Sequence, residues 1–446
     1  MKKFFKNGLA VLSLVAMLFV TGCSDKKTAN LISNVGDNAQ AVVLLNPIDV
    51  LKSAGATIDG GRLSAPGNIK SILKDAEFLK IKGIDYNLVA VAAYDDAPRS
   101  VIFASVKDED AVISSLKKLD CDKSTIKGNE VFTIDGTAYL LLNNQLIRFN
   151  YYSESNLEDY VEEVIDRSQD QLDKWKQDLL LSRSGSTAYG FCDCEDTPID
   201  ELGLNFDGCI AFDLTFNGTK ASAQVKFVNS KGKDVLISEI VGEDLNTIGD
   251  LSKFIYDDAP LSVAWGGIKD ESIASLVSKY AGQNASDLDA LDDISGIAYN
   301  LDFTDPNDFK SIQTTIALST VSGNAGKALK DLADLAESVG ANVSKKGGVY
   351  TFSEAGTEGT MQEQGNVVLV KAGDDFSGAN PSVADCLAYV GLNVPSDHPL
   401  LKQFAKLDIG VKGFLKVTDS VISIEVDLVD SDKPFIQKLI ELAEEF

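Results

Sequence analysis

Apolar and polar residues alternate in two long stretches of the chain, and this pattern predicts two β-hairpins. The first stretch covers residues 209–228 and carries Asn217-Gly218 near its middle, a pair that favours a tight hairpin turn. The second stretch covers residues 410–429 and has the same alternation. Because one face of each hairpin is apolar, we expect both hairpins to cover a core.

Helical spacing of apolar residues appears in several other places. Amphipathic helices are predicted around residues 112–119 and 329–339. Each predicted hairpin also runs into a stretch with helical spacing, at 245–255 and at 435–446, which we interpret as a closing helix. A longer helix is predicted over 155–182, and the second half of the chain has no counterpart to it.

Short segments of the first half return in the second half in the same order. "GIDYNL" at 83–88 corresponds to "GIAYNL" at 296–301, and "VFTID" at 131–135 corresponds to "VYTFS" at 349–353. Such spacing is typical of an internal duplication with small insertions.

The fold class that follows is α+β, with two tandem related lobes that each hold a mainly antiparallel sheet packed with helices. We place lobe 1 at residues 31–250 and lobe 2 at 251–446. If the lobes share one topology, Tyr86 should correspond to Tyr299, and Phe132 to Tyr350.

The amino terminus has the features of an export signal. Three lysines (Lys2, Lys3 and Lys6) precede an apolar stretch at 9–20 that is too short to span a bilayer. The following Thr21-Gly22-Cys23 resembles the lipobox of bacterial lipoproteins. We therefore predict a signal peptide at 1–22, lipid attachment to Cys23, and a short tether at 23–30; the alternative is an ordinary signal with an incidental cysteine.

The chain is strongly acidic. It holds 41 basic and 67 acidic residues, a net charge of −26. Residues 1–22 contain three lysines and no acidic residue, so the mature chain carries 38 basic against 67 acidic residues, or −29. Because phosphate backbones repel such a surface, nucleic acid is excluded as a partner, and the membrane is expected to be reached through the lipid on Cys23.

Patterns that carry chemistry are scarce. His398 is the only histidine, and no nucleophile elbow accompanies it. "GNAGKA" at 323–328 is too short for a phosphate loop, and "DLDALDDISG" at 287–296 lacks the glycine of a calcium loop. "YDDAP" occurs at 94–98 and at 256–260, but the two copies fall outside the register of the repeat, so we interpret both as turns. We expect no catalytic residue, no metal and no cofactor.

The cysteines of the mature body leave two possibilities open. Cys192 and Cys194 would share one face of a strand, so either of them could meet Cys209 on a neighbouring strand and form a disulfide. The alternative is that these residues are buried free thiols.

The lipobox, the opening stretch "NAQAVVLLN", the paired GI-x-YN segments and the acidic body together resemble Bacteroidota lipoproteins of the domain-of-unknown-function 4836 type. The resemblance implies a lipid-anchored protein of the cell envelope and supplies no catalytic residues. Ser24-Asp25 is followed by two lysines, which departs from the acidic surface-export signal of that phylum, so we expect the periplasmic face of the outer membrane rather than the cell surface. Asp419-Ser420-Val421 resembles its O-glycosylation acceptor, which makes Ser420 a candidate site.

Three functions are compatible with these features. The first is a non-catalytic binding or scaffolding lipoprotein whose lobes bind an envelope protein or polymer, with Tyr256 and Asp257 as contacts at the junction of the lobes. The second is a carbohydrate- or nutrient-binding lipoprotein of an outer-membrane uptake system. The third is a hydrolase with a carboxylate-only site.

Overall fold

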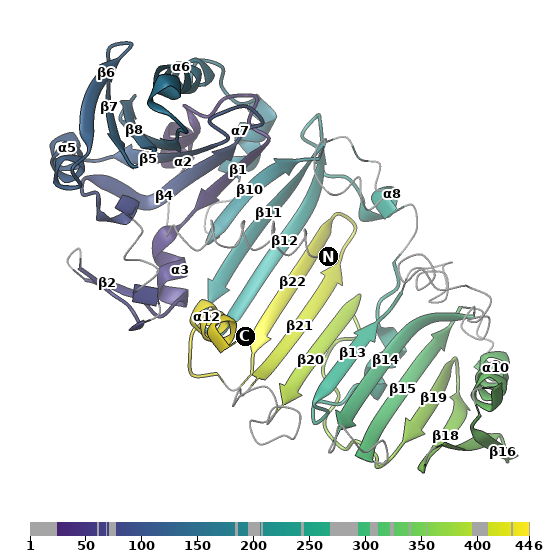
Figure 1. The fold of residues 1–446 in the computed structure, drawn as a ribbon. Coiled ribbons are helices and arrows are strands. Elements are labelled where there is room, and N and C mark those ends of the chain that lie inside the picture. Colours follow the sequence, from purple (N-terminus) through teal and green to yellow (C-terminus); the bar gives the residue numbers. More distant parts are fainter. Residues whose placement is uncertain are drawn as a thin grey trace. The chain divides into compact units, whose positions relative to one another are not determined.

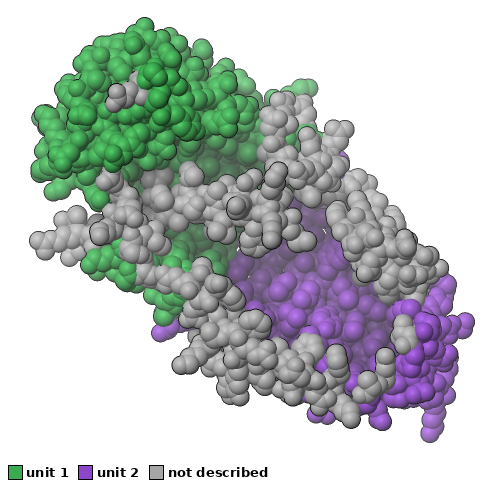
Figure 2. Space-filling view, viewed as in Figure 1, with its two compact units in different colours: residues 1–235, 433–444, 446 green, residues 236–432, 445 purple. Residues whose placement is uncertain are grey.

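The computed structural model divides the chain into two compact units, coloured separately in Figure 2. The first unit holds residues 1–235 and 433–444, and the second holds 236–432. The structure describes residues 25–59, 62–67, 69–70, 77–182, 186–194, 206, 208–241, 245–267, 293–303, 311–321, 325–338, 340–354, 356–394, 409–429 and 431–445. The predicted signal peptide, Cys23, His398 and most of the 287–296 segment lie outside the described residues.

The first unit is built on an antiparallel sheet with the strand order β12-β11-β10-β1-β4-β5-β9-β8-β7-β6 (Figure 1). Its strands are β1 (Ala41–Leu45), β4 (Ile84–Ala93), β5 (Ser100–Val106), β6 (Asp122–Ile126), β7 (Asn129–Ile134), β8 (Thr137–Leu142), β9 (Gln145–Asn150), β10 (Ala188–Asp193), β11 (Gly208–Asn217) and β12 (Lys220–Asn229). A separate hairpin joins β2 (Thr57–Asp59) to β3 (Arg62–Ser64).

Helices cover both faces of this sheet. Helices α2 (Asp25–Ile32), α6 (Leu157–Arg167) and α7 (Lys174–Leu181) pack on one face, where Leu44 and Phe103 are buried. The other face, which carries Leu45 and Ile102, is covered by α5 (Glu109–Lys118) and the 3₁₀ helix η1 (Glu77–Lys80). Because neighbouring residues of a strand point to opposite faces, a sheet with two covered faces needs continuous apolar runs such as "AVVLL" in β1.

The second unit is built on a sheet with the order β22-β21-β20-β13-β14-β15-β19-β18-β17-β16. Its strands are β13 (Leu261–Trp265), β14 (Ile294–Phe303), β15 (Ile312–Thr320), β16 (Asn342–Lys346), β17 (Val349–Glu354), β18 (Thr357–Gln364), β19 (Val367–Ala372), β20 (Ala388–Val394), β21 (Ile409–Val417) and β22 (Val421–Leu428). Helix α10 (Ala325–Ser338) packs on one face, and the 3₁₀ helix η4 (Gly249–Phe254) packs on the other. The predicted α+β class with mainly antiparallel sheets is confirmed in both units.

The strands of the two units follow one another in corresponding order. Tyr86 lies in β4 and Tyr299 in β14, which occupy the same place in their sheets, but the register aligns Tyr299 with Val91, so the predicted pairing of Tyr86 with Tyr299 is wrong at the residue level. Phe132 in β7 and Tyr350 in β17 do correspond, and a lysine of the neighbouring edge strand lies over each ring, 5.6 Å and 4.5 Å from the ring centroid.

The hairpin predicted at 209–228 is present as β11 and β12, but its turn begins one residue later than expected. Asn217 is the last residue of β11 and pairs with Lys220, so Gly218 and Thr219 form the turn. Gly218 has a φ of 59°, as in a two-residue turn with glycine at its first central position.

The predicted tether at 23–30 is wrong over most of its length, because helix α2 begins at Asp25. Thr28, Leu31 and Ile32 are 2 %, 0 % and 3 % exposed, and the leucine and isoleucine belong to the core under α6 and α7. The spacing of these residues is that of one helix face, which the polar composition of the segment concealed.

The long helix predicted over 155–182 is interrupted. Helix α6 ends at Arg167 and α7 starts at Lys174, because the segment between them pairs with residues near the amino terminus. The backbone N–H of Asp37 donates to the carbonyl of Asp170 over 2.8 Å, and Gly36 forms a β-bridge with Gln171.

The two predicted closing helices also differ from expectation. Residues 249–254 form η4, which precedes the first strand of the second unit and packs in that unit's core. Helix α12 (Phe435–Glu445) packs in the first unit, where the Phe435 ring stacks on Phe216 with centroids 5.9 Å apart. Local periodicity found these segments, but it did not reveal which core each one joins.

Candidate functional site

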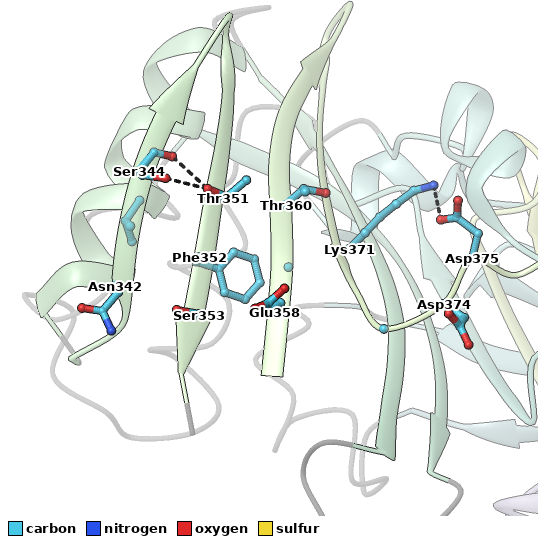
Figure 3. A pocket seen from close by; sticks show the side chains of 13 residues that line it. Asn342, Ser344, Thr351, Phe352, Ser353, Glu358, Thr360, Lys371, Asp374 and Asp375 are labelled. Atoms are coloured by element: carbon cyan, nitrogen blue, oxygen red, sulfur yellow. Dashed lines mark hydrogen bonds and ion pairs between the residues drawn. The ribbon is translucent and has the colours of Figure 1, made fainter. Parts of the chain in front are cut away.

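An open hollow lies on the sheet face of the second unit that points away from α10 (Figure 3). It measures about 840 Å³ and lies over β16, β17, β18 and the end of β19. We call this surface the open face. Its lining is formed mostly by hydroxyl, amide and carboxylate side chains.

Strand alternation explains how the open face arises. On β17, Tyr350 packs against the core beneath α10, whereas Thr351 and Ser353 point the opposite way. The strand register aligns Thr351 with its cross-strand neighbours in one row, which consists of Ser344, Thr351, Thr360 and Lys371. A second row holds Asn342, Ser353 and Glu358. Neighbouring members of such a row lie about 4.8 Å apart, the spacing of paired strands.

Polar contacts hold part of the row in place. The Oγ of Ser344 and the Oγ1 of Thr351 lie 2.7 Å apart, and the Nζ of Lys371 donates to the Oδ1 of Asp375 over 2.6 Å. Figure 3 shows both contacts as dashed lines. The lysine charge is therefore offset within the site by Asp375, whereas Glu358 and Asp374 are exposed carboxylates at its edge.

Two glycines shape the hollow. A side chain at Gly359 would meet the ring of Phe352 at 2.2 Å, so glycine there allows that ring to pack over β18 on the α10 side of the sheet, beneath the hollow. Gly373 has a φ of 74°, a value that glycine adopts without strain, and there the chain turns away after β19. That turn carries Asp374 and Asp375 to the rim of the hollow.

In the first unit the corresponding face is buried. The register that aligns Thr360 with Lys371 in the second unit aligns Ala138 with Phe149 in the first. Ala138 and Phe149 are 0 % and 1 % exposed and share a core with α6 and α7. Residues 151–187 supply those helices between β9 and β10, whereas only residues 373–387 connect β19 to β20. The shorter connection leaves the face of the second unit open.

Tyr256 and Asp257, expected as contacts at the junction of the lobes, have their described contacts inside the second unit. The Tyr256 ring stacks on Phe376 with centroids 6.0 Å apart, and its backbone N–H donates to Oδ1 of the buried Asn300 over 3.0 Å. The N–H of Asp257 donates to the carbonyl of Ala379 over 3.1 Å. These contacts brace the loop that follows the rim of the open face.

In the structure, the three candidate disulfide cysteines are not joined by a disulfide. The register pairs Cys192 with Ile210 and Asp193 with Cys209, so Cys192 and Cys209 point to opposite faces of the sheet. Cys194 follows the end of β10, where its N–H donates to the carbonyl of Gly208 over 2.9 Å. A disulfide between Cys194 and Cys209 stays a prediction.

The surroundings of Cys209 disfavour a reactive thiolate. Burial, together with the negative charge of Asp193, raises the pKa of Cys209 to about 12. Burial also raises the pKa of Asp193, although Lys176 donates to its Oδ2 over 2.8 Å. Among the described residues, no group of three histidine, cysteine, aspartate or glutamate side chains could hold a metal ion.

Ser420 lies in the turn between β21 and β22 and is half-buried. The N–H of Thr418 donates to the carbonyl of Val421 over 2.9 Å and closes this turn. The turn position is the one expected for Ser420, and its glycosylation stays a prediction.

Sequence reasoning did not find the open face. The segment "VYTFS" indicates the repeat, and the polar Thr351 and Ser353 within it are the signal for the open face. A comparison of the two halves strand by strand would have indicated the site, because Phe149 is replaced by Lys371 and Ala138 by Thr360 at corresponding positions.

Comparison with solved structures gives a distant likeness. No family model and no curated protein matches the chain, so the resemblance to the domain-of-unknown-function lipoproteins stays a prediction. Crystal form I of TP0453, a membrane-associated lipoprotein of Treponema, is similar at 14 % identity with a TM-score of 0.31; the match covers 49 % of this chain and 88 % of that one. Crystal form III of the same protein gives 13 % identity and a TM-score of 0.31, over 49 % and 89 %. No helix among the described residues has the length and apolar character needed to cross a membrane.

Proposed function

We propose that this protein is an envelope lipoprotein, anchored through Cys23, that binds an uncharged envelope glycan on its open face without transforming it. We infer that the two units are copies of one α+β lobe, and their corresponding strand orders support this inference. One copy has its sheet face filled by helices, and the other uses the same face for a ligand. The observation that carries the proposal is the hydroxyl row that lines the hollow, in which Ser344 and Thr351 are exposed and Thr360 is half-buried.

The shape of the hollow favours a chain over an enclosed small molecule. Sites for small molecules are mostly apolar and bury most of the ligand, whereas this hollow is polar and open. A glycan lying across the strands would meet hydroxyl groups at the spacing of the strands. Serine and threonine hydroxyls both donate and accept hydrogen bonds, which suits ligands whose own hydroxyls do the same.

Charge narrows the ligand further. Glu358 and Asp374 lie exposed at the hollow, and Lys371 is already paired with Asp375. The whole chain is also acidic, with a net charge of −26. The local carboxylates and the net negative charge of the chain would both repel anionic polysaccharides, so the site selects neutral glycans.

The surroundings of the carboxylate with a raised pKa support binding without catalysis. A carboxylate-only hydrolase needs two carboxyl groups whose pKa values are pushed apart by their surroundings. Asp193 has a raised pKa, but its partner is Lys176 rather than a second carboxylate, and it lies in the first unit.

The test measures binding of the mature chain with Cys23→Ser to a panel of polysaccharides: a mannan, a β-glucan, chitin oligosaccharides and, as an anionic contrast, alginate. Thr351→Trp would fill the middle of the row and should weaken binding to the neutral glycan about tenfold or more, a loss of roughly 1.4 kcal/mol. Thr125→Trp is the matched control, because Thr125 is an exposed threonine of strand β6. Equal affinity in both variants, tighter binding of alginate, or release of shortened sugars would contradict the proposal.

A further inference from the structure

A second hollow lies in the first unit beside helix α2. It measures about 350 Å³ and is lined by polar and apolar side chains of α2, β4 and β5 and by the residue after β5: Lys27, Asn30, Asp85, Leu88, Ser105, Val106 and Lys107. We call it the lysine hollow. None of these residues belongs to the open face, where we propose that a glycan binds.

Asp85 organises the lysine hollow from within. Its side chain is 9 % exposed, and its carboxylate receives Lys27 Nζ on one oxygen over 3.3 Å and Lys107 Nζ on the other over 2.9 Å. The backbone N–H of Asn87 adds a third donor over 3.0 Å. Burial alone would raise the pKa of Asp85, but the hydrogen bonds from Lys107 and Asn87 and the charges of both lysines hold it below its usual value.

The result is a small cationic site on an acidic protein. Two ammonium groups face one carboxylate, so the hollow has a local charge of about +1 by Coulombic counting. The side chains of Lys27 and Lys107 are 51 % and 54 % exposed. An ammonium group has three donors, and each lysine gives one of them to Asp85, so both retain donors directed to solvent. Two lysines held by a buried carboxylate can both donate hydrogen bonds to the oxygens of one phosphate.

The position of the hollow indicates where that phosphate comes from. Only Ser24 separates Cys23 from the start of α2, and Lys27 lies in the first turn of that helix. At no more than about 3.6 Å per extended residue and 1.5 Å per helical residue, the Cα of Lys27 lies within about 10 Å of that of Cys23. The headgroup layer is about 5–7 Å thick on each side of the hydrocarbon core. A lipid on Cys23 would therefore bring the lysine hollow to the headgroups.

We propose that the lysine hollow binds the phosphate of a zwitterionic membrane phospholipid and thereby fixes the first unit against the bilayer. This inference rests on the proposed lipid anchor. Zwitterionic lipid is the partner because a strongly acidic body is repelled by a net negative bilayer, whereas a neutral headgroup still offers its phosphate. The lipid anchor supplies the local concentration, and the hollow supplies the orientation.

The test uses the full mature chain with Cys23→Ser, so that vesicle binding does not depend on lipidation. Partitioning into vesicles of phosphatidylethanolamine and phosphatidylcholine is measured by co-sedimentation at low salt. Lys107→Gln should lower the partition coefficient about fivefold, which corresponds to about 1 kcal/mol, because it removes one of the two charged donors to the phosphate. Lys117→Gln makes the same charge change on the exposed side of α5 and should leave the partition coefficient unchanged.

Asp85→Asn separates headgroup binding from a purely structural ion pair. It keeps both lysines and removes the carboxylate charge that competes with the phosphate for their donors, so vesicle binding should increase about fivefold. A structural ion pair would instead give lower thermal stability in both variants with no change in partitioning, and that result would overturn the proposal. Lysine-dependent binding of inorganic phosphate without binding of vesicles would also overturn it. Loss of the native protein from membranes while vesicle binding persists would refute the lipid anchor alone.

Discussion

Leu31→Ala should destabilise the first unit by about 3 kcal/mol, because helix α2 belongs to the folded body. Leu31 is 0 % exposed and packs in the core formed by α2, α6, α7 and one sheet face. Truncating a fully buried leucine removes its transfer free energy and leaves a cavity, and the two together cost roughly 2–5 kcal/mol. Asn30 is exposed on the same helix, so Asn30→Ala should change the free energy of unfolding by less than about 0.5 kcal/mol.

Tryptophan fluorescence can follow each unit separately. The chain has two tryptophans, Trp175 in the first unit and Trp265 in the second. In a Trp265→Phe background, urea unfolding followed at Trp175 should show a lower midpoint for Leu31→Ala. With a slope of about 3 kcal/mol per molar urea, the shift is about 1 M. In a Trp175→Phe background, the urea midpoint of the second unit, followed at Trp265, should be unchanged by Leu31→Ala. A Leu31→Ala shift no larger than that of Asn30→Ala would show that residues 25–32 are a tether after all.

Three further predictions follow from individual contacts. Arg167→Met should lower the free energy of unfolding of the first unit by roughly 3–5 kcal/mol in urea, because the carbonyls of Pro98 and Asp96 lose their donors and the guanidinium 4.1 Å from the Tyr94 ring is removed. Lys174→Met, at an exposed residue, should change it very little, and equal effects of the two substitutions would refute the stabilising role of Arg167. The pKa of Cys209 is raised to about 12 in the folded protein, so the thiol of the unfolded chain loses its proton at lower pH, and the free energy of unfolding should fall by up to 1.4 kcal/mol per pH unit as pH rises above about 8.5. Cys209→Ala should reduce this slope, and an unchanged slope would contradict the raised pKa of Cys209. Cys23→Ala should move the protein from the membrane fraction to the soluble fraction, and a variant that stays membrane-bound after a high-salt wash would refute lipid attachment.

Local patterns predicted those elements whose stability depends on their own periodicity. Helices α5 and α10 lie within a few residues of the stretches predicted at 112–119 and 329–339, because three-to-four spacing determines which face is buried. The hairpin of β11 and β12 followed from strict alternation, and the glycine of its turn was identified even though the turn begins one residue late. In these segments, the information about burial is local.

Elements that depend on distant partners could not be predicted in the same way. The sequence around Phe435 indicates a helix, but nothing local indicates that its ring would stack on Phe216, far away in the chain. The polar residues of α2 concealed three buried positions that only the neighbouring helices explain. The open face depends on a register across four strands, so Ser344 and Lys371 become neighbours of one site only once the sheet is formed.

Amide hydrogen exchange with a bound neutral glycan tests the central claim most directly. The mature chain with Cys23→Ser is compared with and without the tightest neutral polysaccharide of the panel. Strands β16 and β18, residues 342–346 and 357–364, should gain protection, because they carry Ser344 and Thr360 of the hydroxyl row. Their counterparts β6 and β8, residues 122–126 and 137–142, should exchange at unchanged rates. Protection that appears in the first unit instead, or that appears nowhere at saturating glycan, would contradict the assignment of the open face as the binding site.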